Sequence, residues 1–251
     1  MPTPLGVEDK QNMPESLRRG LAESQTIHVR QDLRAERLQA AAAFRQRMTS
    51  NGTFVVRLLS SPGAGKTTLL QKTAERLTRS YCVGILVGDV ETERDAERLA
   101  PYAPSIQITT GGACHLELPL VERALPKLGA KPLDFLFIED VGNLICPASH
   151  ELGEHLRVIV LSTTEGDDKP GKYPKAFRTS QVVVLSKTDL LPYVPFSLDK
   201  AVADARLIRS DLTFFPLSAH RDEGVDAWCD FLRQQHGAMI ASDRPEQTSS
   251  P

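Results

Sequence analysis

The sequence predicts an α/β fold with three layers, in which helices cover both faces of a mostly parallel sheet of about seven strands. Two observations lead to this prediction. Short apolar runs that suit buried strands alternate with helical patterns over most of the chain. The first apolar run ends in small residues, and Gly63 and Gly65 follow it just before a helical pattern begins.

Each strand is expected where an apolar run is bounded by turn residues. The expected strands span 54–59, 82–87, 105–108, 133–138, 157–161, 181–185 and 213–217. Helical patterns are found at 66–79, 94–100, 117–128, 172–177, 198–209 and 225–235. Arg57 interrupts the apolar run of the first strand, so we expect one end of that strand to lie near solvent or a partner.

The two ends of the chain are expected to lie outside the folded domain, which we place at residues 26–236. Residues 1–25 and 237–251 are polar and lack periodicity, and we expect both segments to be disordered. Residues 26–48 suit a helix that stops at Ser50-Asn51-Gly52. Its expected apolar side consists of Leu33, Leu38, Ala42 and Phe44.

The composition excludes several classes of protein. The 251 residues, of which 41% are hydrophobic and 25% charged, suit one α/β domain with short appendages. A formal net charge of −2 gives no electrostatic reason to expect nucleic-acid binding. No apolar run is long enough to span a membrane, and the N-terminus lacks the core of a signal peptide. The four widely spaced cysteines fit a reducing cytoplasm, where thiols stay available for metal.

A phosphate-binding loop is predicted between the first strand and the next helix. Gly63 and Gly65 allow the backbone to curl, so that several N–H groups point at one anion near the positive end of the helix. Lys66 is expected to reach the β- and γ-phosphates, and the Thr67 hydroxyl is expected to bind Mg²⁺. Ser60 takes the place of the first glycine of the usual pattern. The expected phosphate-binding residues are Gly63, Ala64, Gly65, Lys66, Thr67 and Thr68.

A guanine-binding loop is predicted at the end of the sixth strand. The Asp189 carboxylate can accept hydrogen bonds from N1–H and the 2-amino group of guanine, whereas adenine offers neither donor. The alkyl stem of Lys187 can lie along the base. Ser186 replaces the asparagine usual at this position, which we expect to weaken hydrogen bonds between loops. Ser218 and Ala219 resemble the loop that closes over the base.

Acidic residues follow two other strands. Glu139 comes directly after strand 133–138, and Asp89 follows strand 82–87. Carboxylates at the carboxyl ends of parallel strands can hold Mg²⁺ or position water, so both are candidate catalytic and Mg²⁺-binding residues. Gly142 can offer its backbone N–H to a γ-phosphate. For each acid alone, a structural role at the strand end remains open.

A second, softer metal site is predicted from Cys114, His115 and Cys146. Thiolate and imidazole ligands suit Ni²⁺ or Zn²⁺. Cys146 follows Gly142 within about 14 Å of extended chain, so a phosphate contact that moves Gly142 should also move Cys146. Since one chain offers three evident ligands, we expect a site shared across a homodimer or completed by water.

These motifs together resemble the hydrogenase nickel-incorporation GTPases of the HypB family, within the HypB/UreG group. The most specific matches are Cys114-His115-Leu116 and the run from Asn143 to Ala148, and the resemblance extends from about residue 27 to residue 236. It implies a dimerising P-loop GTPase of the SIMIBI type that hydrolyses GTP slowly. It also implies delivery of Ni²⁺ to the large-subunit precursor of [NiFe]-hydrogenase, together with a HypA-type accessory protein. The family's G-domain metal ligands match Cys114, His115 and Cys146.

The chain departs from the family's pattern at several positions. Asp140 and Ser186 stand where asparagine is common, and Gly112-Ala113 replaces Lys-Gly. Residues 1–27 contain no Cys or His, so we do not expect an N-terminal nickel-storage site. No arginine finger and no switch glutamine is evident, which favours slow GTP hydrolysis.

Three other functions remain open. A urease nickel-insertion GTPase would share the phosphate and guanine loops, although that family typically has Cys-Pro-His where this chain has Cys114-His115-Leu116. A GTP-dependent regulatory switch would need no metal. A small-molecule kinase can also carry the Gly-Ala-Gly-Lys-Thr loop, but Asp189 argues against it.

Overall fold

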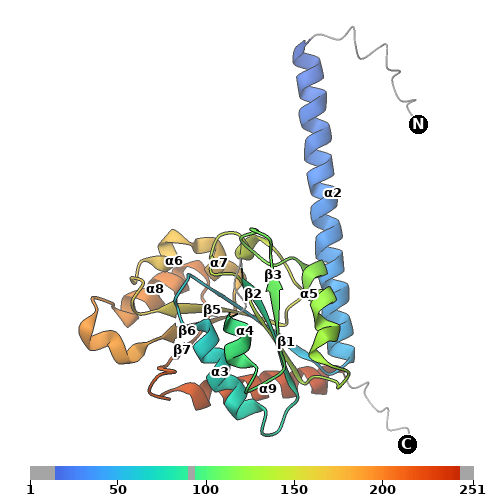
Figure 1. The fold of residues 1–251 in the computed structure, drawn as a ribbon. Coiled ribbons are helices and arrows are strands. Elements are labelled where there is room, and N and C mark those ends of the chain that lie inside the picture. Colours follow the sequence, from blue (N-terminus) through green and yellow to red (C-terminus); the bar gives the residue numbers. More distant parts are fainter. Residues whose placement is uncertain (1–14, 90–93, 244–251) are drawn as a thin grey trace, which may run out of the picture. The chain divides into compact units, whose positions relative to one another are not determined.

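A seven-stranded sheet with the order β3-β2-β4-β1-β5-β6-β7 forms the centre of the protein (Figure 1). The structure is a computed structural model that describes residues 15–89 and 94–243. All neighbouring strands are parallel, as the alternating pattern predicts. The strands are β1 Phe54–Ser60, β2 Val83–Asp89, β3 Ser105–Thr109, β4 Phe135–Glu139, β5 Leu156–Ser162, β6 Val182–Ser186 and β7 Thr213–Pro216.

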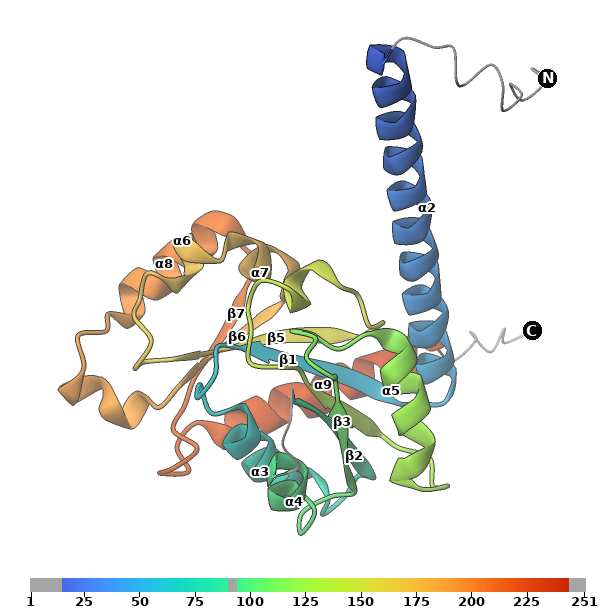
Figure 2. The same ribbon diagram turned by 45° about the horizontal axis from the view of Figure 1, so that its top comes forward.

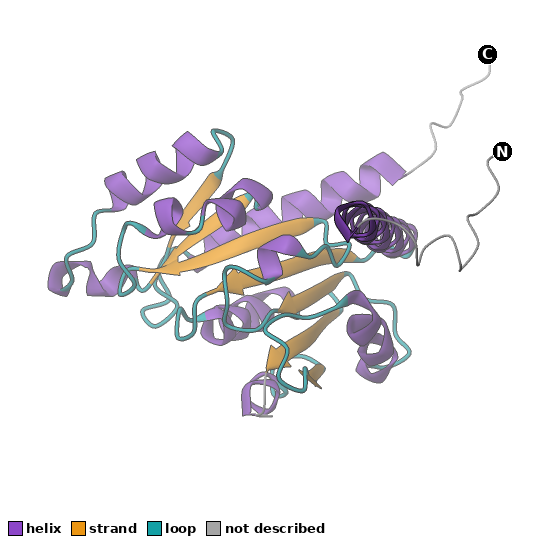
Figure 3. Cartoon of the chain, turned by 90° about the horizontal axis from the view of Figure 1, so that it is seen from above, coloured by secondary structure: helices purple, strands orange, loops and turns teal. Residues whose placement is uncertain are grey.

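Helices cover both faces of the sheet, which confirms the predicted three-layer α/β/α fold (Figure 3). The α-helices are α2 Glu15–Ser50, α3 Lys66–Leu77, α4 Arg94–Leu99, α5 Leu118–Ala124, α6 Lys169–Lys172, α7 Pro174–Thr179, α8 Leu198–Ile208 and α9 Val225–Asp243. The described residues also form three short 3-10 helices: η1 Leu125–Leu128, η2 Pro147–Ser149 and η3 Thr188–Tyr193. No described helix combines the length and the apolar composition that a membrane crossing requires.

Successive side chains of β1 point to opposite faces of the sheet and pack in separate apolar cores. Val56 and Leu58 pack in a core with α3 and α9, which lie on the same face of the sheet (Figure 2). Val55 packs in a second core with α5, and Leu59 packs in a third with α7. Because β1 is buried along its whole length, the loop that follows it starts from a rigid support.

Arg57 does not lie near solvent, contrary to the expectation from the sequence. It is 0% exposed and lies in the middle of β1, between Ile138 of β4 and Arg157 of β5. The pattern along one strand cannot reveal the reason, which is that acidic side chains from other segments surround the guanidinium.

Several helices have other boundaries than the sequence predicts, and prolines account for two of these differences. Pro126 lacks the N–H that a continuing α-helix needs, and the expected helix 117–128 divides into α5 and η1. Pro174 starts α7, so the expected helix 172–177 becomes α6 and α7. The helix α9 continues to Asp243, so the expected disordered tail is helical from 237 to 243.

The N-terminal helix α2 begins at Glu15, well before the expected start, so residues 15–25 are helical. The chain divides into two compact units, Met1–Ala40 and Ala41–Pro251. Within the second unit, the buried side of α2 consists of Ala41, Phe44 and Met48, which share one face of a helix. Leu33, Leu38 and Ala42 are exposed, so that part of the expected apolar side is wrong. The disorder predicted for 1–14 and 244–251 lies outside the described residues.

Candidate nucleotide and metal sites

A cavity of about 590 Å³ opens at the carboxyl ends of β1, β2 and β4. It brings together the predicted phosphate loop, both predicted acids and the start of the guanine loop. The described residues that line it are Pro62, Gly63, Ala64, Gly65, Lys66, Thr67, Thr68, Gly88, Asp89, Asp95, Arg98, Glu139, Asp140, Val141, Gly142 and Lys187. Of these, Asp95 and Arg98 were not among the predicted site residues, and Arg98 donates to Asp95 at 3.2 Å.

The phosphate loop is already in the shape that an anion requires. Gly65 has a φ of 99°, which places the first turn of α3 directly behind the loop. The buried Lys66 donates from Nζ to Ser60 Oγ at 2.8 Å. The Ser60 hydroxyl therefore orients Lys66. Ser60 stands where the usual pattern has glycine, and it is the last residue of the extended strand β1.

Glu139 and Thr67 form a site that fits Mg²⁺. Thr67 Oγ1 donates to Glu139 Oε1 at 3.0 Å. In the described part of the chain, Glu139 Oε2 is buried without a hydrogen-bond partner. Burial raises the pKa of Glu139 to about 7, although the Lys66 ammonium 3.9 Å away opposes this shift. A buried oxygen without a partner beside a threonine hydroxyl is what a hard cation would satisfy. Asp89, from the end of β2, lines the same cavity.

The guanine loop is joined to the phosphate loop by two hydrogen bonds. Ser186 Oγ donates to Ala64 O at 2.7 Å, and Lys187 Nζ donates to Gly63 O at 2.7 Å. Ser186 therefore keeps a direct hydrogen bond between the two loops, although its side chain is shorter than that of the usual asparagine. Lys187 has a φ of 59°, so its backbone turns sharply just before Asp189.

The Asp189 carboxylate lies beside the second base loop. The buried Ser218 donates from Oγ to Asp189 Oδ1 at 2.6 Å, and this bond lowers the pKa of the carboxyl. The acceptor is therefore ionised and oriented, as base recognition needs. Asp189, Ser218 and Ala219 do not line the cavity, which ends at Lys187.

Cys114, His115 and Cys146 come together as the sequence predicts. Their ligand atoms all lie within 4.8 Å of one another. The hydrogen bond between the two thiols raises the pKa of Cys114, and burial lowers the pKa of His115. Among the residues described, the buried His115 Nε2 makes no hydrogen bond. A neutral imidazole beside two thiols is a suitable donor set for Ni²⁺ or Zn²⁺.

The stretch from Gly142 to Cys146 lies between the two sites. Gly142 packs so closely on the phosphate loop that a Cβ there would come within 3.1 Å of Pro62 Cα. Asn143 Nδ2 donates to Cys114 O at 3.4 Å, and Asn143 Oδ1 accepts from Ile145 N at 2.8 Å. One short segment therefore contacts the phosphate loop at one end and carries a candidate metal ligand at the other.

The fold, the phosphate loop and the buried acid define a P-loop nucleotide-binding protein of the NTPase class. Residues 54–216 match the family described as the CobW/HypB/UreG nucleotide-binding domain. The chain belongs to this family, and its relatives place it with the hydrogenase maturation factors HypB.

Three relatives show how far the similarity extends. The hydrogenase maturation factor HypB of Azotobacter chroococcum is 41% identical over 222 residues, which cover 88% of this chain and 73% of the relative. The hydrogenase/urease maturation factor HypB of Helicobacter hepaticus is 39% identical over 240 residues, which cover 94% of this chain and 96% of the relative. The crystal structure of HypB from Helicobacter pylori in complex with nickel is 33% identical, with a TM-score of 0.76. The superposition covers 84% of this chain and 99% of that chain.

Proposed function

We propose that this protein is a GTP-hydrolysing nickel metallochaperone, which delivers Ni²⁺ to the large-subunit precursor of a [NiFe]-hydrogenase with a HypA-type accessory protein. The observation that carries this proposal is the position of the Cys114–His115–Cys146 set. Its ligand atoms lie within 4.8 Å of one another, and Cys146 is on the segment that packs against the phosphate loop. The nickel complex of the Helicobacter pylori relative supports the same cargo.

In this proposal the phosphate loop binds the triphosphate of GTP through its backbone N–H groups. Lys66 neutralises the β- and γ-phosphates, and Asp189 distinguishes guanine from adenine. Thr67 and Glu139, with Asp89 beside them, would hold Mg²⁺, which supplies positive charge to the phosphates when it is bound. The described lining of the cavity contains no glutamine to orient the attacking water, so we expect slow intrinsic hydrolysis.

The same proposal includes a homodimer and a cytoplasmic site of action. Three ligands from one chain leave a tetrahedral metal incomplete, and a second copy or a water would complete it. Zn²⁺ fits the same donor set, so the cargo has to be identified by competition between the two metals.

Nickel binding tests the proposal directly. Replacing Cys114 by Ser removes one thiolate, and we expect the nickel dissociation constant, measured by equilibrium dialysis, to rise at least about tenfold. Cys82→Ser is the matched control, because Cys82 is also exposed but does not belong to the metal cluster. Equal nickel binding by the wild type and the Cys114 variant would instead favour the regulatory switch without a metal.

Urease maturation is the second candidate function, and the Helicobacter hepaticus relative named for both enzymes favours it. Complementation distinguishes the two. Expression in strains that lack the corresponding factor should restore hydrogenase activity, and restored urease activity alone would overturn the primary assignment.

A further inference from the structure

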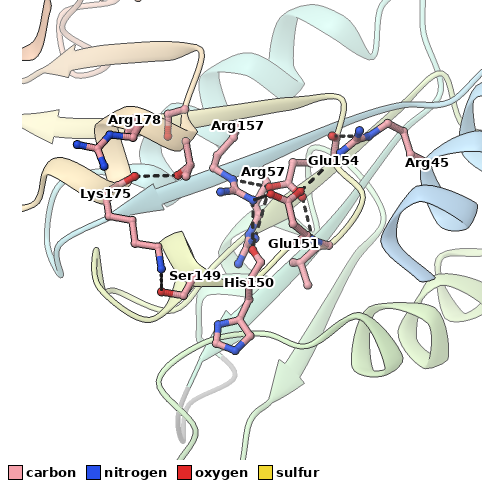
Figure 4. Close-up of polar contacts among 12 residues, drawn as sticks. Arg45, Arg57, Ser149, His150, Glu151, Glu154, Arg157, Lys175 and Arg178 are labelled. Carbon is pink, nitrogen blue, oxygen red and sulfur yellow. Dashed lines mark hydrogen bonds and ion pairs between the residues drawn. The ribbon is translucent and has the colours of Figure 1, made fainter. Parts of the chain in front are cut away.

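Four charged side chains form a cluster inside the sheet and the loop above it. Arg57 and Arg157 lie on the neighbouring strands β1 and β5, and they face two carboxylates, Asp140 and Glu154. All four are at most 4% exposed. Figure 4 shows the two guanidinium groups converging on Glu154 and on the backbone of His150. Replacing a buried ion pair by apolar residues is often neutral or stabilising, so the cluster by itself is weak evidence of a gain in stability.

Arg57 uses its whole guanidinium group to connect two segments. Its Nε donates to Asp140 Oδ2 at 2.8 Å, and its Nη2 donates to the same oxygen. Its Nη1 points the other way, donating to His150 O at 2.6 Å and lying 3.4 Å from Glu154 Oε1. The planar group therefore fixes the distance between Asp140 and the His150 backbone.

Asp140 extends this constraint to the segment that carries Cys114 and His115, and to the Val141-Gly142 segment that packs on the phosphate loop. Its second oxygen, Oδ1, accepts from Leu116 N at 3.1 Å and from Val141 N at 2.8 Å. Leu116 directly follows His115, and Val141 directly precedes Gly142. The Asp140 carboxylate therefore orients the backbone next to the candidate metal ligand His115 and the backbone next to Gly142, which packs on the phosphate loop.

His150 extends the constraint to the segment that carries Cys146. Its carbonyl also accepts from Arg157 Nη2 at 3.2 Å, and its ring Nδ1 donates to Cys146 O at 2.9 Å. The His150 ring stacks on the His115 ring, with centroids 3.8 Å apart and planes 21° from parallel. His150 therefore contacts both the segment that carries His115 and the segment that carries Cys146.

We propose that Arg57 is a positioning residue for the metal site, whose guanidinium sets the spacing between the His115 and Cys146 segments and ties both to Val141-Gly142. This inference rests on the proposed metal function of Cys114, His115 and Cys146. Arginine is suited to the role because its rigid, planar group holds three acceptors in fixed directions, whereas lysine offers one point charge. Glu154 stays ionised to balance the second guanidinium: burial opposes its charge, but Arg57 and Arg157 outweigh burial and lower its pKa to about 2.

The test compares Arg57→Lys with the wild type in nickel affinity, measured by competition with a chelator, and in the thiolate-to-nickel charge-transfer absorption. Lysine keeps the charge beside Asp140 but cannot also hold His150 O. We therefore expect nickel affinity to fall at least about tenfold and the absorption band to shift, with GDP affinity within about twofold of the wild type. Arg76→Lys is the control, because Arg76 pairs with Asp222 and Asp226 outside the metal-binding segments.

A second variant covers the case in which Arg57→Lys does not fold. The double change Arg57→Asn with Asp140→Asn removes both charges together, so that neither is left buried and unpaired, and we expect the same loss of nickel affinity. A folded variant of either kind with wild-type affinity and an unshifted band would overturn the inference. If the wild type itself binds no nickel at Cys114 and Cys146, the proposed function fails instead.

Amide hydrogen exchange gives an independent measurement on the unmodified chain. Since Asp140 holds the amides of both Leu116 and Val141, nickel binding at His115 should slow exchange at Val141 as well as at Leu116. Protection confined to the residues next to the ligands, with unchanged exchange at Val141, would contradict the connection through Asp140.

Discussion

Replacing Glu139 by Gln is expected to stabilise the nucleotide-free protein while lowering its GTP hydrolysis rate about a hundredfold. The carboxylate is buried, and one of its oxygens has no partner among the described residues. Its pKa in the folded protein is about 7, above the 4.5 of the unfolded chain, so the unfolded chain loses the proton first as pH rises. The ionised group therefore costs stability increasingly from pH 4.5 to 7, and fully above pH 7.

The neutral amide removes this cost, and we expect the free energy of unfolding at pH 8 to rise by about 3 kcal/mol. The same change replaces the candidate Mg²⁺ ligand by a weaker one, which is why hydrolysis falls. Chemical denaturation of both proteins at pH 5 and pH 8 should show that the variant gains stability relative to the wild type as pH rises, because other groups that titrate in this range, such as His155, act equally in both proteins. Glu97→Gln is the control, since Glu97 is exposed on α4. A variant that hydrolyses GTP at the wild-type rate would remove Glu139 from the Mg²⁺ site.

Replacing Asp189 by Asn should change the preferred nucleotide from GTP to XTP. The carboxylate accepts from N1–H and the 2-amino group of guanine in the proposed complex, and an amide cannot accept from both. Xanthine has an oxygen in place of the 2-amino group, so the amide N–H₂ can donate to it. Asn can still accept the hydrogen bond from Ser218 Oγ, which keeps the side chain in place.

We expect the GTP dissociation constant of this variant to rise at least about a hundredfold and XTP to bind more tightly than GTP. Fluorescent nucleotide displacement measures both constants. Asp199→Asn is the control, because Asp199 lies in the first turn of α8 and is exposed. If ATP binds the wild type as tightly as GTP does, Asp189 does not read guanine and the kinase interpretation gains support.

The sequence was enough to predict the elements whose signals are local. The sheet follows from apolar runs of strand length, and the phosphate loop follows from two glycines and Lys66 placed between a strand and a helix. Cys114, His115 and Cys146 could be predicted as one metal site from their thiol and imidazole donors and from the family resemblance, and the structure brings their ligand atoms together.

The buried charge cluster could not be predicted, because it depends on which strands become neighbours. Arg57 and Asp140 are far apart in the sequence, and they meet because β1 pairs with β4 in a register that places Arg57 opposite Ile138. The sequence contains one signal that could have indicated the pair. A charged residue inside a buried strand needs a partner of opposite charge, and Asp140 is an acid at the end of another buried strand.

The start of α2 was also not predicted. The helix α2 continues across the expected boundary at residue 26, and its buried face is set by contacts within the unit that starts at Ala41. The extent of the folded domain, 26–236, and the individual roles of the site residues stay predictions.

The most direct test of the account is a nickel titration of the wild-type protein in its GDP state and in the state bound to a non-hydrolysable GTP analogue. Because Gly142 packs on the phosphate loop and Cys146 lies on the same segment, the two states should differ in nickel affinity by at least about fivefold. The Cys146→Ser variant should lose this difference. Identical nickel affinities in the two nucleotide states would contradict the coupling on which the delivery mechanism depends.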